Sequence, residues 1–316
     1  MRDEIVLERI LKGDEEPKDL PLALLQDITN DFSQQNKIGQ GGFGEVYKGV
    51  LRNGVVVAVK RIHINVDTID DKLFHREFHS LWKTTNHQNV VRFLGFCSNN
   101  QTTIVNAGSE QIKLANVRER LLCFEYISNG SLDKHITNEL RGLERETRYD
   151  IITGICKGLS HLKEKRIIHM DLKPANILLN DHMVPKITDF GLSRPNENSH
   201  TMGQRFGTRG YLAPEYENAG RTLFESDIYS LGAIIIELVT GCMGVPDENN
   251  VLRRWRHRWN KPPTLLQYQQ VIRCINIAIR CREQKPEARP SILEIISFLS
   301  KSETIDVHTG QVRTYM

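Results

Sequence analysis

The chain has 316 residues, which exceeds one ordinary small domain and suits either two domains or one large bilobed unit. Apolar residues make up 39% of it and charged residues 26%, a balance that argues against extensive disorder or a fibrous array. The formal net charge of +3 is small for this length, so charge alone gives no reason to expect a nucleic acid or an anionic membrane as partner.

The cysteines and the apolar segments indicate the cellular compartment of the chain. Six cysteines lie mostly in apolar runs, without a C-x-x-C pair or the clustering of a disulfide framework, which favours a reducing compartment. The first ten residues lack the apolar core of a signal peptide, and Arg2 excludes N-myristoylation. The most apolar stretch, residues 231–239, is about half as long as a membrane span. We therefore expect a cytoplasmic location, with no direct membrane insertion.

Taken in chain order, the predicted elements change from strands to helices. Residues 1–31 form an N-terminal flanking segment, in which Pro17 and Pro21 interrupt any long helix. Residues 38–126 are strand-like apart from one helix at about 71–84, and the polar stretch 98–119 between the last two strands is long enough to be a flexible surface insert. From Ser131 helical periodicity dominates, and residues 301–316 form a loose tail.

A glycine cluster opens the strand-like region. Gly39, Gly41 and Gly44 are spaced so that backbone N–H groups could approach phosphate oxygens without an intervening Cβ. Dinucleotide-binding sites share this spacing, but their third glycine opens a helix, whereas residues 45–48 here continue as a strand. The pattern alone is weak evidence for either site.

Lys60 ends the apolar strand Val57-Ala58-Val59. A lysine buried there is costly unless it meets an anion, although its tip could also reach water. Glu77 is a suitable anion, because it lies on one helical stripe between Leu73 and Leu81, and a carboxylate on an inward face needs a cation.

The strongest signal is the pair of segments IHMDLKPANILL (168–179) and ITDFG (187–191). Together with the glycine cluster and Lys60, in this order, they resemble the eukaryotic protein kinase family. The lysine two residues after Asp171 is typical of its serine/threonine branch. The resemblance covers about residues 32–300 and implies an α+β, bilobal fold. Residues 32–127 would form a small antiparallel β-sheet lobe with one main helix, and residues 128–300 a larger, mainly helical lobe.

The resemblance implies transfer of the γ-phosphate of ATP to a Ser or Thr hydroxyl of a protein substrate. Asp171 would accept the hydroxyl proton and Lys173 would steady the γ-phosphate, while Lys60, paired with Glu77, would hold the α and β phosphates. Asn176 and Asp189 would hold Mg²⁺, with Mn²⁺ as an alternative metal. The implied nucleotide-binding residues are Ile38, Gly39, Gly41, Gly44, Val46, Ala58, Lys60, Glu125, Ile127 and Leu178, with Phe124 at the back of the adenine site.

The same resemblance implies structural roles further along the chain. The activation segment would run from Asp189 to Glu215, with the stretch 207–211 (GTRGY) seating the acceptor peptide. Arg289 would pair with Glu215, and Asp227 would brace the catalytic loop.

One residue departs from the common kinase pattern. Many kinases have an arginine before the catalytic Asp, and a phosphate on the activation segment neutralises its charge, but here the residue is Met170. We therefore hypothesise that activity does not depend strictly on phosphorylation of this segment. The hydroxyls expected to be available for phosphorylation are Ser193, Ser199, Thr201 and Thr208.

This departure, with the phrases FGTRGYLAPEY and GFGEVYKGVL, resembles plant receptor-like kinases, which usually carry an ectodomain and a membrane span. This sequence has neither. We expect a receptor-like cytoplasmic kinase, or a receptor kinase that has lost or been cut from its outer part. Either would act in receptor-linked signalling and associate with the plasma membrane through partners such as a membrane receptor kinase complex.

The sequence leaves three other interpretations. A pseudokinase acting as a scaffold would have the same fold, but the chain retains Lys60, Glu77, Asp171, Asn176 and Asp189. A metal site at His75 and His79 lacks a third ligand at suitable spacing. Residues 251–259 mix basic and aromatic side chains, but their apolar stripe favours an amphipathic helix over nucleic-acid binding.

Overall fold

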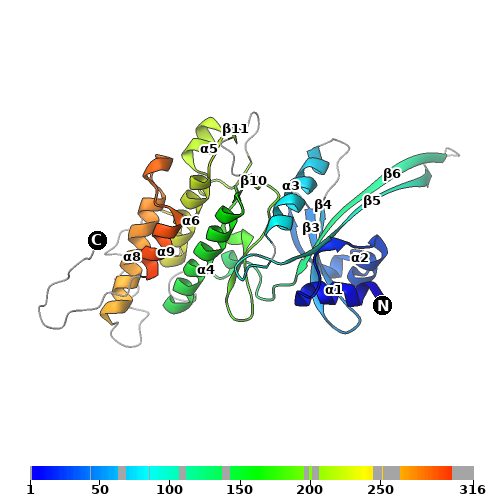
Figure 1. The fold of residues 1–316 in the computed structure, drawn as a ribbon, viewed down its shortest axis with the longest axis horizontal. Helices are drawn as coiled ribbons and strands as arrows, with labels where there is room; N and C mark the ends of the chain where they lie inside the picture. The colour runs from blue at the N-terminus through cyan, green and yellow to red at the C-terminus, as the bar shows by residue number, and fades with distance from the viewer. Residues whose placement is uncertain are drawn as a thin grey trace, which may run out of the picture.

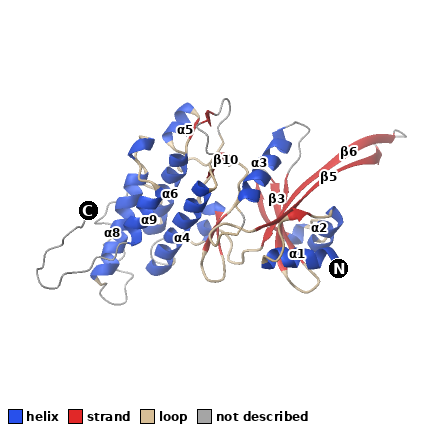
Figure 2. Cartoon of the chain, in the orientation of Figure 1, coloured by secondary structure: helices blue, strands red, loops and turns tan. Residues whose placement is uncertain are grey.

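The computed structural model describes residues 2–42, 44–62, 69–84, 86–106, 112–136, 143–195, 199–200, 206–244, 251 and 264–300. They form a strand-rich lobe followed by a helical lobe (Figures 1 and 2), so the α+β, bilobal fold expected from the sequence is confirmed. The predicted amphipathic helix after residue 251 and the predicted tail at 301–316 lie outside the described residues.

The first lobe is built on a six-stranded sheet. Its strands are β1 (Lys18–Asp19), β2 (Lys37–Gly41), β3 (Gly44–Val50), β4 (Val56–Ile62), β5 (Phe93–Asn106) and β6 (Ile112–Glu125). Their order is β1-β5-β6-β4-β3-β2, and every pair is antiparallel except β1 with β5. Helix α3 (Ile69–Lys83) lies between this sheet and the helical lobe (Figure 1). The helix predicted at about 71–84 is therefore present.

The stretch 98–119 differs from the flexible insert that we expected. Strands β5 and β6 run through most of it, pairing from Phe93 opposite Phe124 to Asn106 opposite Ile112. They form a ribbon that projects well past the rest of the sheet (Figure 1). The polar composition concealed the strand propensity of the β-branched run 102–105 (TTIV).

The N-terminal segment packs as part of the first lobe. Helix α1 (Arg2–Lys12) ends before Pro17, and helix α2 (Leu22–Thr29) begins directly after Pro21, so the predicted helix interruption is confirmed. Leu7 and Leu25 are fully buried in an apolar cluster with the outer side of the sheet. The Glu4 carboxylate accepts a hydrogen bond from the Arg52 backbone N–H at 2.8 Å, which fixes α1 to the β3–β4 turn.

The second lobe is built of helices around α6 (Figure 2). Its helices are α4 (Arg145–Glu164), α5 (Pro214–Ala219), α6 (Phe224–Thr240), α8 (Leu265–Cys281) and α9 (Ile292–Ser300). Its short strands are β7 (Ile167–Ile168), β8 (Ile177–Leu179), β9 (Pro185–Ile187), β10 (Arg194–Pro195), β11 (Ser199–His200) and β12 (Arg221–Thr222). Short 3-10 helices lie at Leu132–Lys134, Pro174–Asn176 and Pro286–Ala288 in this lobe, and one at Gln34–Asn36 precedes β2 in the first lobe.

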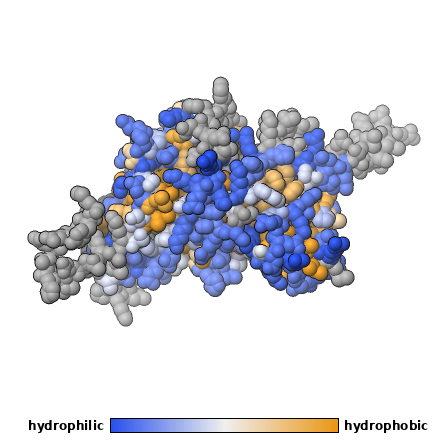
Figure 3. All heavy atoms as spheres, in the orientation of Figure 1, coloured by the Kyte–Doolittle hydropathy of each residue, from blue (hydrophilic) through white to orange (hydrophobic). Residues whose placement is uncertain are grey.

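Helix α6 explains the most apolar stretch of the sequence. It is buried on nearly every side, which is why residues 231–239 are apolar without the periodicity of a surface helix. Among the helices described, none combines the length and the apolar character that crossing a bilayer requires. The face of the molecule in Figure 3 is mainly hydrophilic, with smaller apolar patches.

The burial of α1 generates a stability prediction. Leu7→Ala removes a side chain with no exposed surface, and we expect it to lower the free energy of unfolding by about 2–5 kcal/mol. Ile5→Ala on the same helix is the matched control, because Ile5 is 57% exposed, and we expect a change of about 0.5 kcal/mol or less. Urea titration followed by circular dichroism measures both. Equal effects would show that α1 is not packed in this way.

Candidate active site

Lys60 lies at the centre of the candidate active site. Its Nζ is 2.8 Å from both carboxylate oxygens of Glu77 on α3 and 2.7 Å from Oδ1 of Asp189, which follows β9. Burial alone would lower the pKa of Lys60, but the Asp189 and Glu77 carboxylates raise it above its usual value, so the ammonium stays charged. Burial likewise favours the neutral acid of Asp189, yet Lys60 holds the pKa of that carboxyl below its usual range. Segments from both lobes thus meet at one charge cluster.

The register of the sheet places the predicted adenine-site residues on one face. Val46 of β3 lies opposite Lys60, and Lys60 lies opposite Leu122 of β6. Ala58 lies two residues before Lys60 and opposite Phe124. Because strand side chains alternate between faces, these residues share the face that carries the Lys60 ammonium.

The remaining predicted nucleotide-site residues lie around that face. Ile38 is 44% exposed at the edge, whereas Ile127, just after β6, is 7% exposed. Leu178 comes from β8 of the second lobe and is half-buried. The Glu125 carboxylate is already occupied, because it accepts hydrogen bonds from the Arg92 backbone N–H at 2.7 Å and from Lys186 Nζ at 2.8 Å.

Glycine suits positions 39, 41 and 44 for different physical reasons. At Gly44 a Cβ would lie 2.3 Å from the Arg61 carbonyl oxygen, so strand pairing alone requires glycine there. At Gly41 a Cβ would meet no atom within 4 Å, which leaves open backbone suited to a phosphate. At Gly39 the nearest atom to a Cβ would be Val46 Cβ at 3.6 Å, an ordinary contact. Gly44 begins β3, so the helix that a dinucleotide site needs at this point is replaced by a strand.

The catalytic-loop side chains converge on Asp171. Lys173 Nζ lies 2.8 Å from its Oδ2, and Asn176 Nδ2 donates to its backbone oxygen at 2.8 Å and to Oδ2 at 3.1 Å. The Thr208 hydroxyl donates to Oδ1 at 3.0 Å and accepts from Lys173 Nζ at 2.7 Å. Sequence reasoning counted Thr208 among the phosphorylation sites and within the acceptor-seating stretch, but it did not predict this contact. Its place within the predicted acceptor-seating stretch 207–211 was the available signal.

Asp227 fixes the backbone that carries these side chains. It is fully buried, and its carboxylate accepts hydrogen bonds from the N–H groups of His169 at 2.6 Å and Met170 at 2.9 Å. Burial raises the pKa of Asp227, while the His169 ring and these two N–H groups oppose that shift. Met170 has a φ of +70°, a left-handed conformation that is unfavourable for a side chain other than glycine. The two hydrogen bonds to Asp227 hold this strained turn in place.

Glu215 and Arg289 form the buried pair that the resemblance implied. Arg289 Nη1 and Nη2 lie 2.8 and 2.7 Å from the two carboxylate oxygens, and the Arg289 side chain has no exposed surface. Burial favours the neutral acid, but the hydrogen bonds from Arg289 and Ser226 hold the pKa of Glu215 below its usual value. The end of the activation segment is thereby fixed to the helical lobe.

Comparison with known proteins identifies the family to which this chain belongs. The protein kinase domain matches residues 32–298, and the chain therefore belongs to the protein kinase family. Its relatives in Arabidopsis thaliana include cysteine-rich receptor-like protein kinases 41 and 26, at 33% and 37% identity over 93% and 88% of this chain. A G-type lectin S-receptor-like serine/threonine-protein kinase is 36% identical over 92% of the chain. The matched regions span 45%, 43% and 35% of these relatives, so this chain covers less than half of each.

Two of the expected phosphorylation sites are not free in this structure. Ser193 is 1% exposed, and its hydroxyl donates to the Phe190 carbonyl oxygen at 2.7 Å, so the expectation that it is available is wrong. Thr208 is held by the catalytic loop, as described above. Ser199 lies in β11, which pairs with β12, and Thr201 lies outside the described residues. The exclusion of Ser193 arises from tertiary packing, which its local sequence does not reveal.

Ser193 also joins α3 to the segment after Phe190. Its oxygen lies 2.6 Å from Ser80 Oγ, and because its own proton goes to Phe190, Ser80 is the donor. We expect Ser80→Ala and Ser193→Ala each to destabilise the fold by about 1 kcal/mol, with a coupling of similar size in the double variant. Urea unfolding measures the cycle, and Ser80→Ala combined with the exposed, distant Ser297→Ala is the additive control. Additivity of the Ser80 and Ser193 effects would contradict the bond.

Proposed function

We propose that this chain is a protein serine/threonine kinase that transfers the γ-phosphate of ATP to Ser or Thr hydroxyls of a protein substrate. The observation that carries the proposal is the position of Lys60 Nζ, 2.7–2.8 Å from both Glu77 and Asp189. A charged lysine in this position can bind phosphate oxygens while its carboxylate partners limit the cost of burial.

In this proposal Asp171 accepts the proton of the substrate hydroxyl. Its two carboxylate oxygens are oriented by Thr208 on one side and by Lys173 and Asn176 on the other, so little reorganisation is needed when a hydroxyl arrives. Lys173 is positioned to neutralise charge on the transferring phosphoryl group. The predicted nucleotide-site face of Val46 and Ala58 would contact the adenine ring.

Asn176 and Asp189 fit a hard divalent cation. The Asn176 NH₂ group donates twice to Asp171, which leaves its amide oxygen as the free acceptor. An amide oxygen and an ionised carboxylate are donors that Mg²⁺ accepts when phosphate oxygens complete its coordination. The metal would supply neutralisation of phosphate charge, and Mn²⁺ would be an alternative.

The setting we propose is receptor-linked signalling in the cytoplasm. The support is the similarity to receptor-like kinases, and partners such as a membrane receptor kinase complex would bring the chain to the plasma membrane. No nucleic acid is proposed as partner.

The proposed lobe boundaries are 32–127 for the nucleotide-binding lobe and 128–300 for the catalytic and substrate-binding lobe. The scaffold alternative, a pseudokinase, has no observation in its favour.

The central test compares the chain with an Asp171→Asn variant. We expect labelling of a peptide library from labelled ATP and Mg²⁺ to fall by about 10²–10⁴-fold, because the acceptor of the hydroxyl proton is lost. Lys165→Asn is the control, since Lys165 is exposed and lies at the end of α4, outside the catalytic loop. EDTA should abolish labelling in every sample. Equal labelling by the parent chain and Asp171→Asn would favour the scaffold alternative.

The hypothesis that activity does not depend strictly on activation-segment phosphorylation is tested at Ser199 and Thr201. Met170 is 6% exposed and uncharged, so it leaves no charge at this position for an activation-segment phosphate to neutralise. We expect a Ser199→Ala/Thr201→Ala variant to retain most of its kcat toward an acceptor peptide. Loss of activity in this variant, with recovery in Ser199→Asp/Thr201→Glu, would show that the hypothesis is wrong.

A further inference from the structure

Arg92 ends the connector, residues 86–92, which lies between α3 and β5, and its backbone is bonded to Glu125. Its N–H donates to the Glu125 carboxylate at 2.7 Å, and its carbonyl oxygen accepts from the Glu125 N–H at 3.0 Å. Lys186 Nζ donates to the same carboxylate oxygen at 2.8 Å. Because Glu125 and Ile127 are implied to contact the adenine ring, the connector borders the proposed nucleotide site.

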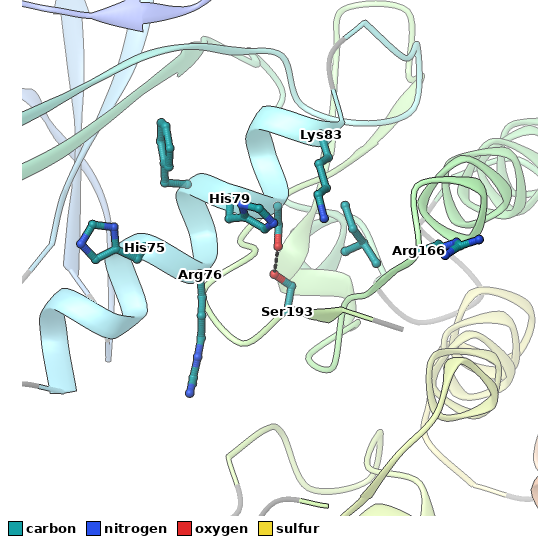
Figure 4. Close-up of a pocket in the computed structure, with 9 residues that line it drawn as sticks. His75, Arg76, His79, Lys83, Arg166 and Ser193 are labelled. Carbon is teal, nitrogen blue, oxygen red and sulfur yellow. Dashed lines mark hydrogen bonds between the residues drawn. The ribbon is translucent and has the colours of Figure 1, made fainter. Parts of the chain in front are cut away.

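The second lobe also restrains this part of the chain. Helix α3, which precedes the connector, is bonded to the second lobe through Ser80, whose Oγ lies 2.6 Å from Ser193 Oγ (Figure 4). Within the connector, the Val91 N–H donates to the Ile187 carbonyl oxygen at 2.9 Å. The backbone of the connector is therefore tied to the active-site side, whereas the Arg92 side chain is bonded elsewhere, to the N-terminal segment.

The Arg92 guanidinium meets the C-terminal end of α1. It donates to the Leu11 carbonyl oxygen and to Asn86 Oδ1. Leu11 lies in the last turn of α1, where carbonyl groups lack partners within the helix and a cation is favourable. Gly13 ends the helix with a φ of +91°, and a Cβ there would lie only 3.3 Å from Arg92 Nη2. Glycine at this position therefore provides both the left-handed turn and the room for the guanidinium.

The earlier turns of α1 are fixed to the turn between β3 and β4. The Glu4 carboxylate accepts from the Arg52 N–H, and Glu8 Oε1 accepts from Asn53 Nδ2 at 2.6 Å. Strands β3 and β4 carry the predicted nucleotide-site face. Helix α1 thus bridges the strands of that face and the residue whose backbone holds Glu125.

We propose that Arg92 is a positioning residue for the proposed nucleotide site, and that α1 sets nucleotide affinity through it without contacting the nucleotide. The guanidinium fixes Arg92 to α1, and the Arg92 backbone fixes Glu125 beside the adenine position. A contact that is ordered before the ligand arrives costs less entropy on binding, so loosening Glu125 weakens binding. The inference rests on the proposed kinase function, because it assumes that Glu125 and Ile127 contact adenine.

Binding is tested on the full chain with a fluorescent ATP analogue labelled on the ribose, in the presence of Mg²⁺. We expect Arg92→Ala to bind the analogue about fivefold more weakly than the parent. Adenosine, measured by displacement of the analogue, should lose affinity by the same factor, because the affected contact is with adenine. Weaker binding of the analogue with unchanged adenosine affinity would indicate a long-range charge effect and would overturn the proposal.

Two variants separate the contact with α1 from other effects. Arg92→Lys keeps a cation at the end of α1 and should restore affinity to within about twofold of the parent. Asn86→Gly is the matched control, because it removes the other acceptor of the guanidinium and glycine suits the φ of +63° at this exposed position. It should bind both ligands as the parent does. Equal affinity of the parent and Arg92→Ala would overturn the proposal.

Hydrogen exchange reports on the link to Glu125 without any nucleotide. The segment 121–127 should exchange faster in Arg92→Ala than in Asn86→Gly, because the Glu125 N–H is bonded to Arg92. If Arg92→Ala fails to fold by circular dichroism, Gly13→Ala replaces it, since it crowds the guanidinium from α1 and leaves Arg92 in place. Unchanged exchange in a variant with weakened binding would overturn the proposed route through Glu125.

Steady-state kinetics distinguish positioning from a role in the chemical step. We expect Arg92→Ala to raise KM for ATP about fivefold while kcat stays within about twofold of the parent, and a lower kcat with unchanged KM would overturn the proposal. Arg92-dependent binding to a chain that transfers no phosphate would support the positioning role and contradict only the proposed function. A parent chain that binds neither the analogue nor adenosine would overturn both.

Discussion

The contact of Lys60 with Glu77 and Asp189 is the constraint on which the rest of the structure depends. A buried ammonium costs several kcal/mol unless opposite charges and hydrogen bonds surround it, so an incomplete cluster would be strongly destabilising. Completing it requires the β4 register that puts Lys60 on the inner face, the orientation of α3 that turns Glu77 inward, and the placement of Asp189 after β9. One charge cluster thereby couples the folding of both lobes to the geometry of the candidate site.

The sequence predicted the parts of the fold that have clear local periodicity, and it failed where local composition was misleading or where tertiary packing decides. The helical stripe of Glu77 and the strand ending at Lys60 were visible as periodicity, and the structure pairs the two residues. The stretch 98–119 was misjudged because its polar composition outweighed its β-branched run. The burial of Ser193 was unforeseen because it depends on α3, which lies more than a hundred residues earlier in the chain.

The catalytic loop holds its shape without the arginine that many kinases have before the catalytic Asp. Its turn is strained at Met170, and the Asp227 carboxylate offsets that strain by accepting two adjacent N–H groups from within the helical core. Side-chain contacts from Thr208 and Lys173 then orient Asp171. The order of this loop therefore comes from α6 and from the activation segment itself. This is the physical reason to expect limited dependence on an added phosphate.

Helix α3 is where these features meet. Glu77 joins it to the sheet, Ser80 joins it to the segment after Phe190, and burial together with the nearby Arg194 guanidinium lowers the pKa of Arg76, so that these two guanidinium groups repel each other. The first two interactions favour the position of α3 seen here, whereas the third opposes it. Because Glu77 and Ser80 lie one helical turn apart, a movement of this turn would change the pairing of Lys60 and the contact with Ser193 together.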